Sequence, residues 1–243
     1  TWYYAMSPLI DGYKIILVPG SQDGCVFALD IANGNYIWKG GNDGAGYSTP
    51  VKATIQGKTQ YVVFSSSGVG GYDAADGTPL WFVQWKTEYD VNAAQPIVID
   101  NSVFITSGYG KGCALIDIAE DMSAKVRWSS KAIQAHFNSS VYVNGYIYGI
   151  GDPGNLVCLN PKDGSVAWSK DGFEKGGVVS VDGVIIAQDG ANGNVVCVAC
   201  DSSGYKELGR FAGLGGQSWT APIVADSKLI IRNKTLIACY DLK

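Results

Sequence analysis

The chain has 243 residues, of which 47% are hydrophobic and only 16% are charged, and its formal net charge is −4. This composition excludes a mainly disordered chain, because it supplies ample apolar surface for a buried core. The negative charge argues against nucleic acid as a partner. The longest purely aliphatic run, residues 15–18, is far shorter than a membrane span requires, and the aromatic residues after Thr1 do not resemble a signal peptide.

Short β-strands are the expected secondary structure throughout the chain. Glycine contributes 32 residues and proline 8, while aromatic residues make up 12%. Frequent turn formers between bulky β-forming residues are typical of many short strands with tight connections. No long segment shows the apolar spacing of an amphipathic helix, so the predicted class is all-β.

Turn sequences recur at regular intervals along the chain. In order they are Asp11-Gly12, Gln56-Gly57, Asp100-Asn101, Asn144-Gly145, Asp182-Gly183 and Asp226-Ser227. Their second residues are 38 to 45 residues apart. Asn-Gly and Asp-Gly suit a two-residue hairpin turn in which both central residues have positive φ. Each repeat is therefore predicted to open with a β-hairpin.

A second pattern follows each hairpin: a strand ending in Asp or Asn, a turn containing Gly, and then a large aromatic residue. Its members are Asp30, Gly34 and Trp38; Asp73, Gly77 and Trp81; Asp117 and Trp128; Asn160, Gly164 and Trp168; and Phe211. The third repeat has a longer turn, and the fifth has Phe where the others have Trp. We expect these aromatic rings to dock between neighbouring sheets, where their burial stabilises the fold.

Four short strands in about 43 residues are typical of one blade of a β-propeller. We predict a single propeller domain over residues 1–243 with about six visible four-stranded blades. The predicted blades are approximately 1–43, 44–88, 89–131, 132–172, 173–213 and 214–243, the last of them incomplete.

The residues 28–38 follow the pattern Ala-Leu-Asp-x-x-x-Gly-x-x-x-Trp, which resembles the tryptophan-docking motif of PQQ-like (quinoprotein-like) propellers. Residues 7–12, 47–51, 108–115 and 236–241 look like repeat proteins related to the BamB-type outer-membrane-protein assembly factors. The resemblance covers essentially the whole chain. Such proteins usually have eight blades, so the resemblance implies part of an eight-bladed propeller. It also implies a non-catalytic periplasmic, or otherwise extracytoplasmic, binding or scaffold protein with a protein partner.

Two other functions remain open. One is a fragment of a PQQ-dependent alcohol dehydrogenase, and the other is a carbohydrate-recognition propeller with a glycan as partner. The enzymes that the repeats resemble carry a disulfide between adjacent cysteines, calcium ligands and a catalytic Asp. No two of the six cysteines here are adjacent. The sequence leans against an enzyme, and it assigns no catalytic, cofactor-binding or metal-binding residue and no cofactor.

Several remaining features have ordinary structural explanations. The six cysteines are expected to be small buried residues rather than disulfides. His136, the single histidine, has no Gly-x-Ser-x-Gly motif to accompany it. The glycine-rich loops at 152–155 and 189–194 are interpreted as turns rather than calcium loops. Trp2 and Trp219 lie outside the repeat pattern, and either surface recognition of a peptide or glycan or ordinary packing would explain them.

Overall fold

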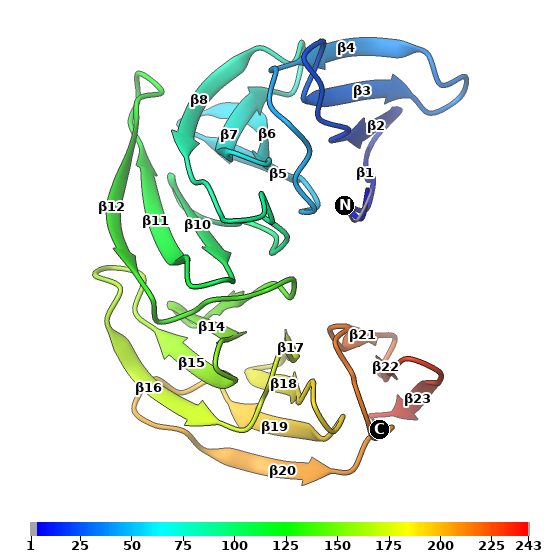
Figure 1. Ribbon diagram of the computed structural model, residues 1–243, viewed down its shortest axis with the longest axis vertical. Helices are drawn as coiled ribbons and strands as arrows, with labels where there is room; N and C mark the ends of the chain where they lie inside the picture. The colour runs from blue at the N-terminus through cyan, green and yellow to red at the C-terminus, as the bar shows by residue number, and fades with distance from the viewer. Residues whose placement is uncertain (1–3, 243) are drawn as a thin grey trace. The chain divides into compact units, whose positions relative to one another are not determined.

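The computed structural model describes residues 4–242, which form strands, turns and loops without a helix. They are arranged in five four-stranded and one three-stranded antiparallel sheets (Figure 1). The predicted all-β class is therefore confirmed. The chain divides into two compact units, Thr1–Ser129 and Ser130–Lys243. The assignment of all residues to one domain stays a prediction.

The first unit holds three consecutive four-stranded sheets, each with its strands side by side in chain order. The first sheet is β1 (Leu9–Asp11), β2 (Lys14–Leu17), β3 (Val26–Asp30) and β4 (Tyr36–Gly40). The second is β5 (Val51–Ile55), β6 (Lys58–Phe64), β7 (Gly68–Asp73) and β8 (Pro79–Gln84). The third is β9 (Ile97–Ile99), β10 (Ser102–Ser107), β11 (Gly112–Ile118) and β12 (Ala124–Ser130).

The second unit holds two four-stranded sheets and the three-stranded one. Its first sheet is β13 (Val141–Val143), β14 (Tyr146–Gly151), β15 (Asn155–Leu159) and β16 (Val166–Asp171). The next is β17 (Gly177–Val181), β18 (Val184–Gln188), β19 (Val195–Ala199) and β20 (Glu207–Phe211). The last is β21 (Ile223–Ala225), β22 (Lys228–Arg232) and β23 (Ile237–Asp241).

The recurring turn sequences lie between the first two strands of each sheet. In the β5–β6 turn both Gln56 and Gly57 have positive φ, 50° and 74°. The turns at 144–145, 182–183 and 226–227 share this conformation, which suits Asn, Asp and Gly. The first hairpin differs from the expectation. Asp11 still pairs with Lys14, so the turn centres on Gly12 and Tyr13, one residue later than predicted.

Hydrophobic cores form between successive sheets of the first unit. Between its first and second sheets, Ile16, Ala28 and Trp38 cluster with Tyr61 and Tyr72. A second core joins the second and third sheets, and its buried members include Phe64, Trp81, Val103, Ile105 and Ile116. A sheet in this arrangement is buried by its neighbour rather than by a helical layer.

The second unit repeats this packing. Tyr148, Leu156 and Trp168 of its first sheet cluster with Ile185 and Val196 of the next. Another core joins the last two sheets and includes Ile186, Val195, Leu229 and Ile231. The β-branched and aromatic side chains of these short strands therefore pack between successive sheets, so an inner sheet is covered on both faces.

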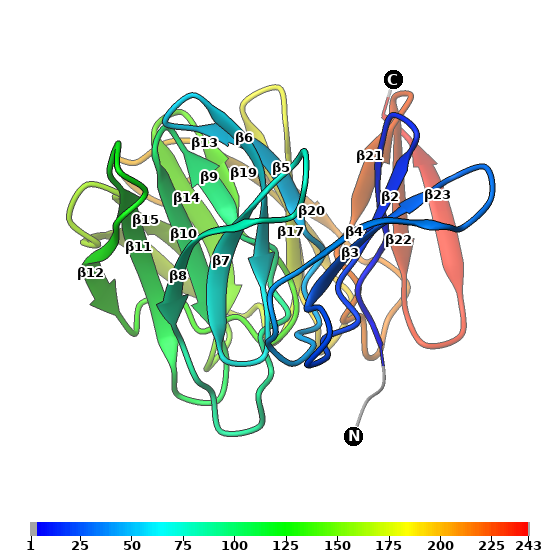
Figure 2. The same cartoon turned by 90° about the horizontal axis from the view of Figure 1, so that it is seen from above.

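The strand order places two kinds of connection at opposite ends of each sheet. Figure 2 shows the β1–β2 and β5–β6 turns of the first unit at its upper end and the β8–β9 connection at its lower end. In an antiparallel meander, the connection between the second and third strands lies at the same end as the connection to the next sheet. We call this the loop end of each unit. No helix within residues 4–242 has the length and apolar character needed to cross a membrane.

Candidate functional site

The repeated tryptophans lie on the last strands of their sheets; Trp128 is half-buried, and the other three are almost completely buried. Trp38, Trp81 and Trp168 are 8%, 6% and 9% exposed. The Trp38 ring lies 5.9 Å from that of Tyr61 on the next sheet. A Cβ atom at Gly77 would come within 2.4 Å of the Trp38 ring, so only glycine leaves room for the indole there. A docking role requires this kind of environment, and the role itself stays a prediction.

The polar residues of the repeat stabilise the turn before each tryptophan. The Oδ1 atoms of Asp30, Asp73 and Asn160 each accept a hydrogen bond from the backbone N–H two residues later. The glycines that follow donate a backbone hydrogen bond back to the same residue and have positive φ; they are Gly34, Gly77 and Gly164.

The third and fifth repeats depart from this pattern. Asp117 forms an ion pair with Arg127 and accepts a hydrogen bond from Ser102, so it does not cap the turn. Trp128 lies 6.2 Å from Phe104 of its own sheet. Phe211 packs against Tyr240, with 5.0 Å between ring centroids.

The two tryptophans proposed for surface recognition have different outcomes. Trp2 lies outside the described residues. Trp219 lies in the β20–β21 connection at the loop end of the second unit, where its side chain is 41% exposed. Trp219 therefore makes the loop end of the second unit a candidate binding surface.

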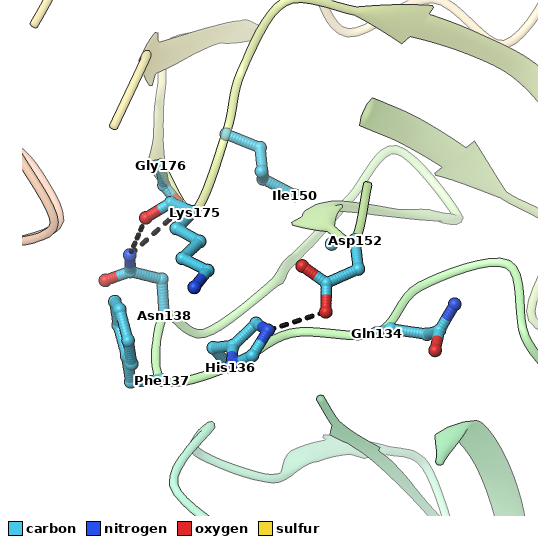
Figure 3. A pocket seen from close by; sticks show the side chains of 9 residues that line it. Gln134, His136, Phe137, Asn138, Ile150, Asp152, Lys175 and Gly176 are labelled. Carbon is cyan, nitrogen blue, oxygen red and sulfur yellow. Dashed lines mark hydrogen bonds and ion pairs between the residues drawn. The ribbon is translucent and has the colours of Figure 1, made fainter. Parts of the chain in front are cut away.

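Asn138, in the β12–β13 connection, holds three neighbouring backbone segments together. Its Nδ2 atom donates to the carbonyl oxygens of Lys175, Gly176 and Trp219 at 3.0 to 3.1 Å. Figure 3 shows two of these bonds. One amide group therefore ties the β12–β13, β16–β17 and β20–β21 connections to one another. The same bonds occupy the nitrogen of the Asn138-Ser139-Ser140 glycosylation sequence.

The backbone beside Lys175 is fixed by steric constraints as well. Lys175 has a φ of 46°, which is uncommon for a residue with a side chain. A Cβ atom at Gly176 would lie 1.9 Å from the Gln188 carbonyl oxygen, which excludes any larger residue without a backbone shift. Together with the Asn138 bonds, this fixes the point from which the Lys175 side chain extends.

His136 and Asp152 form a hydrogen-bonded pair in a small pocket next to Asn138 (Figure 3). Their Nε2 and Oδ2 atoms are 2.6 Å apart, and the side chains are 10% and 35% exposed. The pocket lining contains no serine or cysteine that such a pair could activate as a nucleophile. The hydrogen bond between His136 and Asp152 therefore holds the β12–β13 connection against the β14–β15 turn. Besides this pair and Lys175, the pocket lining offers no group suited to catalysis.

Trp219 also lines a more open groove. It has a volume of about 390 Å³ and is lined by Gln217, Trp219, Thr220, Arg232, Asn233 and Lys234. Phe137, which is 37% exposed, lies 5.4 Å from Trp219 between ring centroids. The Lys175 Nζ atom lies 5.1 Å from the centroid of the indole. This surface thus combines exposed aromatic rings with three cationic side chains.

The loop end of the first unit has a different polar chemistry. Asp43 accepts hydrogen bonds from the hydroxyls of Ser65, Ser66 and Ser67 and from two backbone N–H groups. Burial pushes the pKa of Asp43 upward, but the hydrogen bonds from Ser65 and Ser67 outweigh it and hold this pKa below its ordinary value. These hydrogen bonds therefore stabilise the ionised form of the Asp43 carboxylate.

The cysteines of the chain are all free thiols. Cys25, Cys113 and Cys158 are buried, as expected, and burial raises the pKa of Cys158 to about 11. Cys197 and Cys200 are only half-buried. Cys239, on the outermost strand of the three-stranded sheet, is exposed, so the expectation of buried cysteines is wrong for this residue.

A family model described as "Outer membrane protein assembly factor BamB" matches residues 4–170, more than half of the chain. The chain belongs to the BamB family of PQQ-like propellers. The predicted relationship, which was based on the Trp-containing repeats, is confirmed. A search of curated proteins found no match.

Solved structures support the same fold. The chain is similar to BamB from Moraxella catarrhalis, with 19% identity and a TM-score of 0.74 over 96% of this chain and 70% of that one. It is also similar to quinohemoprotein alcohol dehydrogenase from Comamonas testosteroni, with 12% identity and a TM-score of 0.67 over 97% of this chain and 52% of that one. A computationally designed protein, Ika8, has 12% identity and a TM-score of 0.59 over 97% of this chain and 82% of that one. These likenesses establish the β-propeller fold and leave function open.

The residues of this BamB-family chain do not fit a quinone and its calcium ion. The thiols are separate and free, so they do not form the disulfide of adjacent cysteines expected for the related enzymes. Within residues 4–242, no group of three or more His, Cys, Asp or Glu side chains is placed to hold a metal ion. The side chains that the structure describes therefore do not match the quinone site expected of those enzymes.

Proposed function

We propose that this BamB-family chain is a non-catalytic binding or scaffold propeller that works outside the cytoplasm and holds a protein partner at the loop end of its second unit. Family membership supports the compartment and the kind of partner, because the matching family model describes an outer-membrane-protein assembly factor. The scaffold role rests on the loop end itself.

The observation that carries the proposal is the exposed Trp219 on a rigid base. Its carbonyl oxygen is held by Asn138, and the backbone N–H of the preceding, buried Ser218 donates to Gly190 at 2.9 Å. Exposed aromatic side chains on a fixed backbone lose little conformational entropy when they bind, which is why they are enriched at protein interfaces. A fixed platform with exposed rings suits binding better than catalysis.

Site-specific photo-cross-linking in the cell envelope tests the proposal. A photoreactive phenylalanine analogue replaces Thr220 in the groove, and in a matched control it replaces exposed Lys162 at the opposite end of the same unit. We expect a discrete protein adduct from position 220 and little or none from position 162. Equal adducts at both positions, or none at position 220, would contradict the proposed binding end.

A thermal-shift measurement separates this role from the oxidoreductase alternative. Pyrroloquinoline quinone and Ca²⁺ are added to the purified chain, and a ligand that binds the folded state raises the melting temperature by mass action. We expect no shift. A large shift that needs both components would favour a quinoprotein over a scaffold.

A further inference from the structure

We infer that the groove beside Trp219 is a recognition site for an acidic peptide segment that carries an aromatic or proline side chain next to its carboxylates. This inference rests on the proposed protein-binding function and names the chemistry of the partner. The groove lies entirely within the second unit, between the β20–β21 and β22–β23 connections.

The first argument is charge. Arg232 and Lys234 line the groove, and Lys175 lies over the indole of Trp219. Within the part of the chain that the structure describes, none of these three cations forms an ion pair, although five other lysine or arginine side chains do. The chain as a whole has a formal net charge of −4. Three unpaired cations around one groove of an acidic chain indicate an anionic ligand.

The second argument is the fixed geometry of the cations. Asn233 lies between Arg232 and Lys234, and its Nδ2 atom donates to the carbonyl oxygens of Leu214 and Gly215. Its Oδ1 atom accepts from the backbone N–H groups of Thr235 and Leu236. The side chain thus closes the turn and ties it to the β20–β21 connection. These bonds occupy the side-chain nitrogen of Asn233 and fix the backbone from which the Arg232 and Lys234 side chains extend.

The third argument is the pair of exposed aromatic rings. Trp219 and Phe137 are 41% and 37% exposed and are tilted by 38° to each other. Exposed indole and phenyl rings accept aromatic or proline side chains, and Trp and Arg often dominate the free energy of protein binding. A volume of about 390 Å³ holds a few side chains rather than a folded element.

The combination favours a short acidic peptide over a long polyanion. Three cations are sufficient for one or two carboxylates, and the guanidinium of Arg232 can bind a carboxylate through two hydrogen bonds. A nucleic acid or a highly charged polysaccharide would extend beyond the groove onto a chain that is negative overall. Gln217 and Thr220, at the rim, supply polar groups for a peptide backbone.

Fluorescence anisotropy with synthetic peptides tests the inference. The probe is a fluorescein-labelled octapeptide with two glutamates beside one phenylalanine, and its comparison peptides replace the glutamates with glutamine or the phenylalanine with alanine. We expect the acidic aromatic peptide to bind at least 10-fold more tightly than either comparison peptide. Affinity should fall as salt is raised, because ionic strength screens exposed charges.

Variants locate the site. We expect Trp219→Ala, and separately the double variant Arg232→Gln and Lys234→Gln, to weaken peptide binding at least 10-fold. Trp219→Phe keeps an aromatic ring and should retain most of the affinity. The matched control, Tyr109→Ala with Lys111→Gln, removes an exposed ring and a cation from the first unit and should leave binding unchanged. Circular dichroism confirms that each variant is folded.

Three outcomes would overturn the inference: equal binding of the acidic and glutamine peptides, equal loss in the control variant, or binding of polygalacturonate at Trp219 without peptide binding. The cross-linking experiment separates this failure from failure of the proposed function. If the envelope protein still cross-links to the Arg232→Gln and Lys234→Gln variant, the scaffold role stands and the acidic-segment inference fails. If no protein cross-links to the unmodified chain, the scaffold role itself fails.

Discussion

The loop ends of the two units are built from the same connections but differ in how their polar groups are satisfied. In the first unit, Asn92 is fully buried, its Nδ2 atom donates to Ser65, Ser66 and Trp85, and its Oδ1 atom accepts from Ser107. In the second unit, Asn138 also donates to three carbonyl oxygens, but these belong to two other connections, and Asn138 lies close to the surface beside exposed Trp219.

The carboxylates at the two loop ends also differ in how well their surroundings stabilise the charge. Asp43 in the first unit is surrounded by serine hydroxyls, and its pKa lies below the ordinary value. Burial raises the pKa of Asp189 in the second unit, and the negative charge of Glu174 raises it further, although the backbone N–H of Ala191 opposes this. At the first loop end, Asn92 and Asp43 form their hydrogen bonds with groups of the same unit. The second retains exposed rings, unpaired cations and an unfavourable buried charge, which are common at sites that bind a partner.

The largest difference in stability loss is expected between substitutions of two tryptophans, Trp81 and Trp219. Trp81, which is 6% exposed, donates from Nε1 to the Oε1 atom of Gln60 at 2.6 Å, so Trp81→Ala removes a core ring and leaves that buried oxygen without this donor. We expect the free energy of unfolding to fall by about 3–5 kcal/mol. Trp219→Ala should cost less than about 1 kcal/mol, because Trp219 is already 41% exposed and lies outside the cores between the sheets. Denaturant unfolding measures both, and similar losses would contradict the docking role of the repeated tryptophans.

The two asparagine bridges provide the next contrast. Asn92→Ala leaves buried carbonyl groups and the Ser107 hydroxyl without this partner, and we expect a loss of about 2–3 kcal/mol in the free energy of unfolding. Asn138→Ala should cost about 1 kcal/mol, since water can reach the groups it leaves. The same variant should weaken acidic-peptide binding several-fold by releasing the Trp219 backbone. A larger stability loss for Asn138→Ala than for Asn92→Ala would contradict the proposal that polar groups are buried at the first loop end and accessible at the second.

The two aspartates should respond to pH with opposite signs. The lowered pKa of Asp43 means that its contribution to stability is present above the unfolded pKa of about 3.9 and is lost as pH falls through the folded value. Asp43→Asn should therefore lower the free energy of unfolding by about 1–2 kcal/mol at pH 7 and by less under acidic conditions.

Asp189 has a raised pKa, so its folded state binds the proton more tightly, and its ionised form is unfavourable above the folded pKa. Asp189→Asn should raise stability at pH 7 by up to about 1 kcal/mol, and the gain should vanish below about pH 4. Asn160, in the β15–β16 turn of the preceding sheet, accepts the same kind of backbone hydrogen bond in a turn with the same backbone pattern, so the substitution is compatible with the turn at Asp189. Thermal unfolding across this pH range checks both signs, and a parallel pH response of the two variants would refute the contrast.

The repeated elements could be predicted because each one repeats a local requirement. Gly34, Gly77 and Gly164 recur where the turn has positive φ, and three of the four repeated tryptophans lie in the cores that join successive sheets. The hairpin turns were located to within one residue for the same reason, since Asn-Gly and Asp-Gly favour that backbone conformation. Local chemistry, repeated at a fixed interval, therefore predicts the fold.

The candidate site depends on residues that are far apart in the sequence and recur nowhere. Asn138 reaches Trp219 over 81 residues, and Arg232 and Lys234 line the groove from yet another connection. In the sequence, Asn138 stands out only as part of a glycosylation sequence, and His136 only as a single histidine. The repeat period does place all of these loops at the same end of their sheets. It does not indicate which side chains meet there or which cations stay unpaired.

The smallest expected effect on stability concerns the two lysines that lie over tryptophan rings. Lys111 lies 4.5 Å from the ring of buried Trp85, and Lys175 lies 5.1 Å from the ring of exposed Trp219. Exposed cation–π contacts contribute about 0.5–1 kcal/mol, so Lys111→Gln and Lys175→Gln should each lower the free energy of unfolding by no more than this. Peptide binding should nevertheless separate the two variants. Lys175→Gln should weaken the acidic peptide several-fold, whereas Lys111→Gln should have no effect. Loss of binding in both would show that the cations act through the overall charge of the protein, and the groove would then have no special part in recognition.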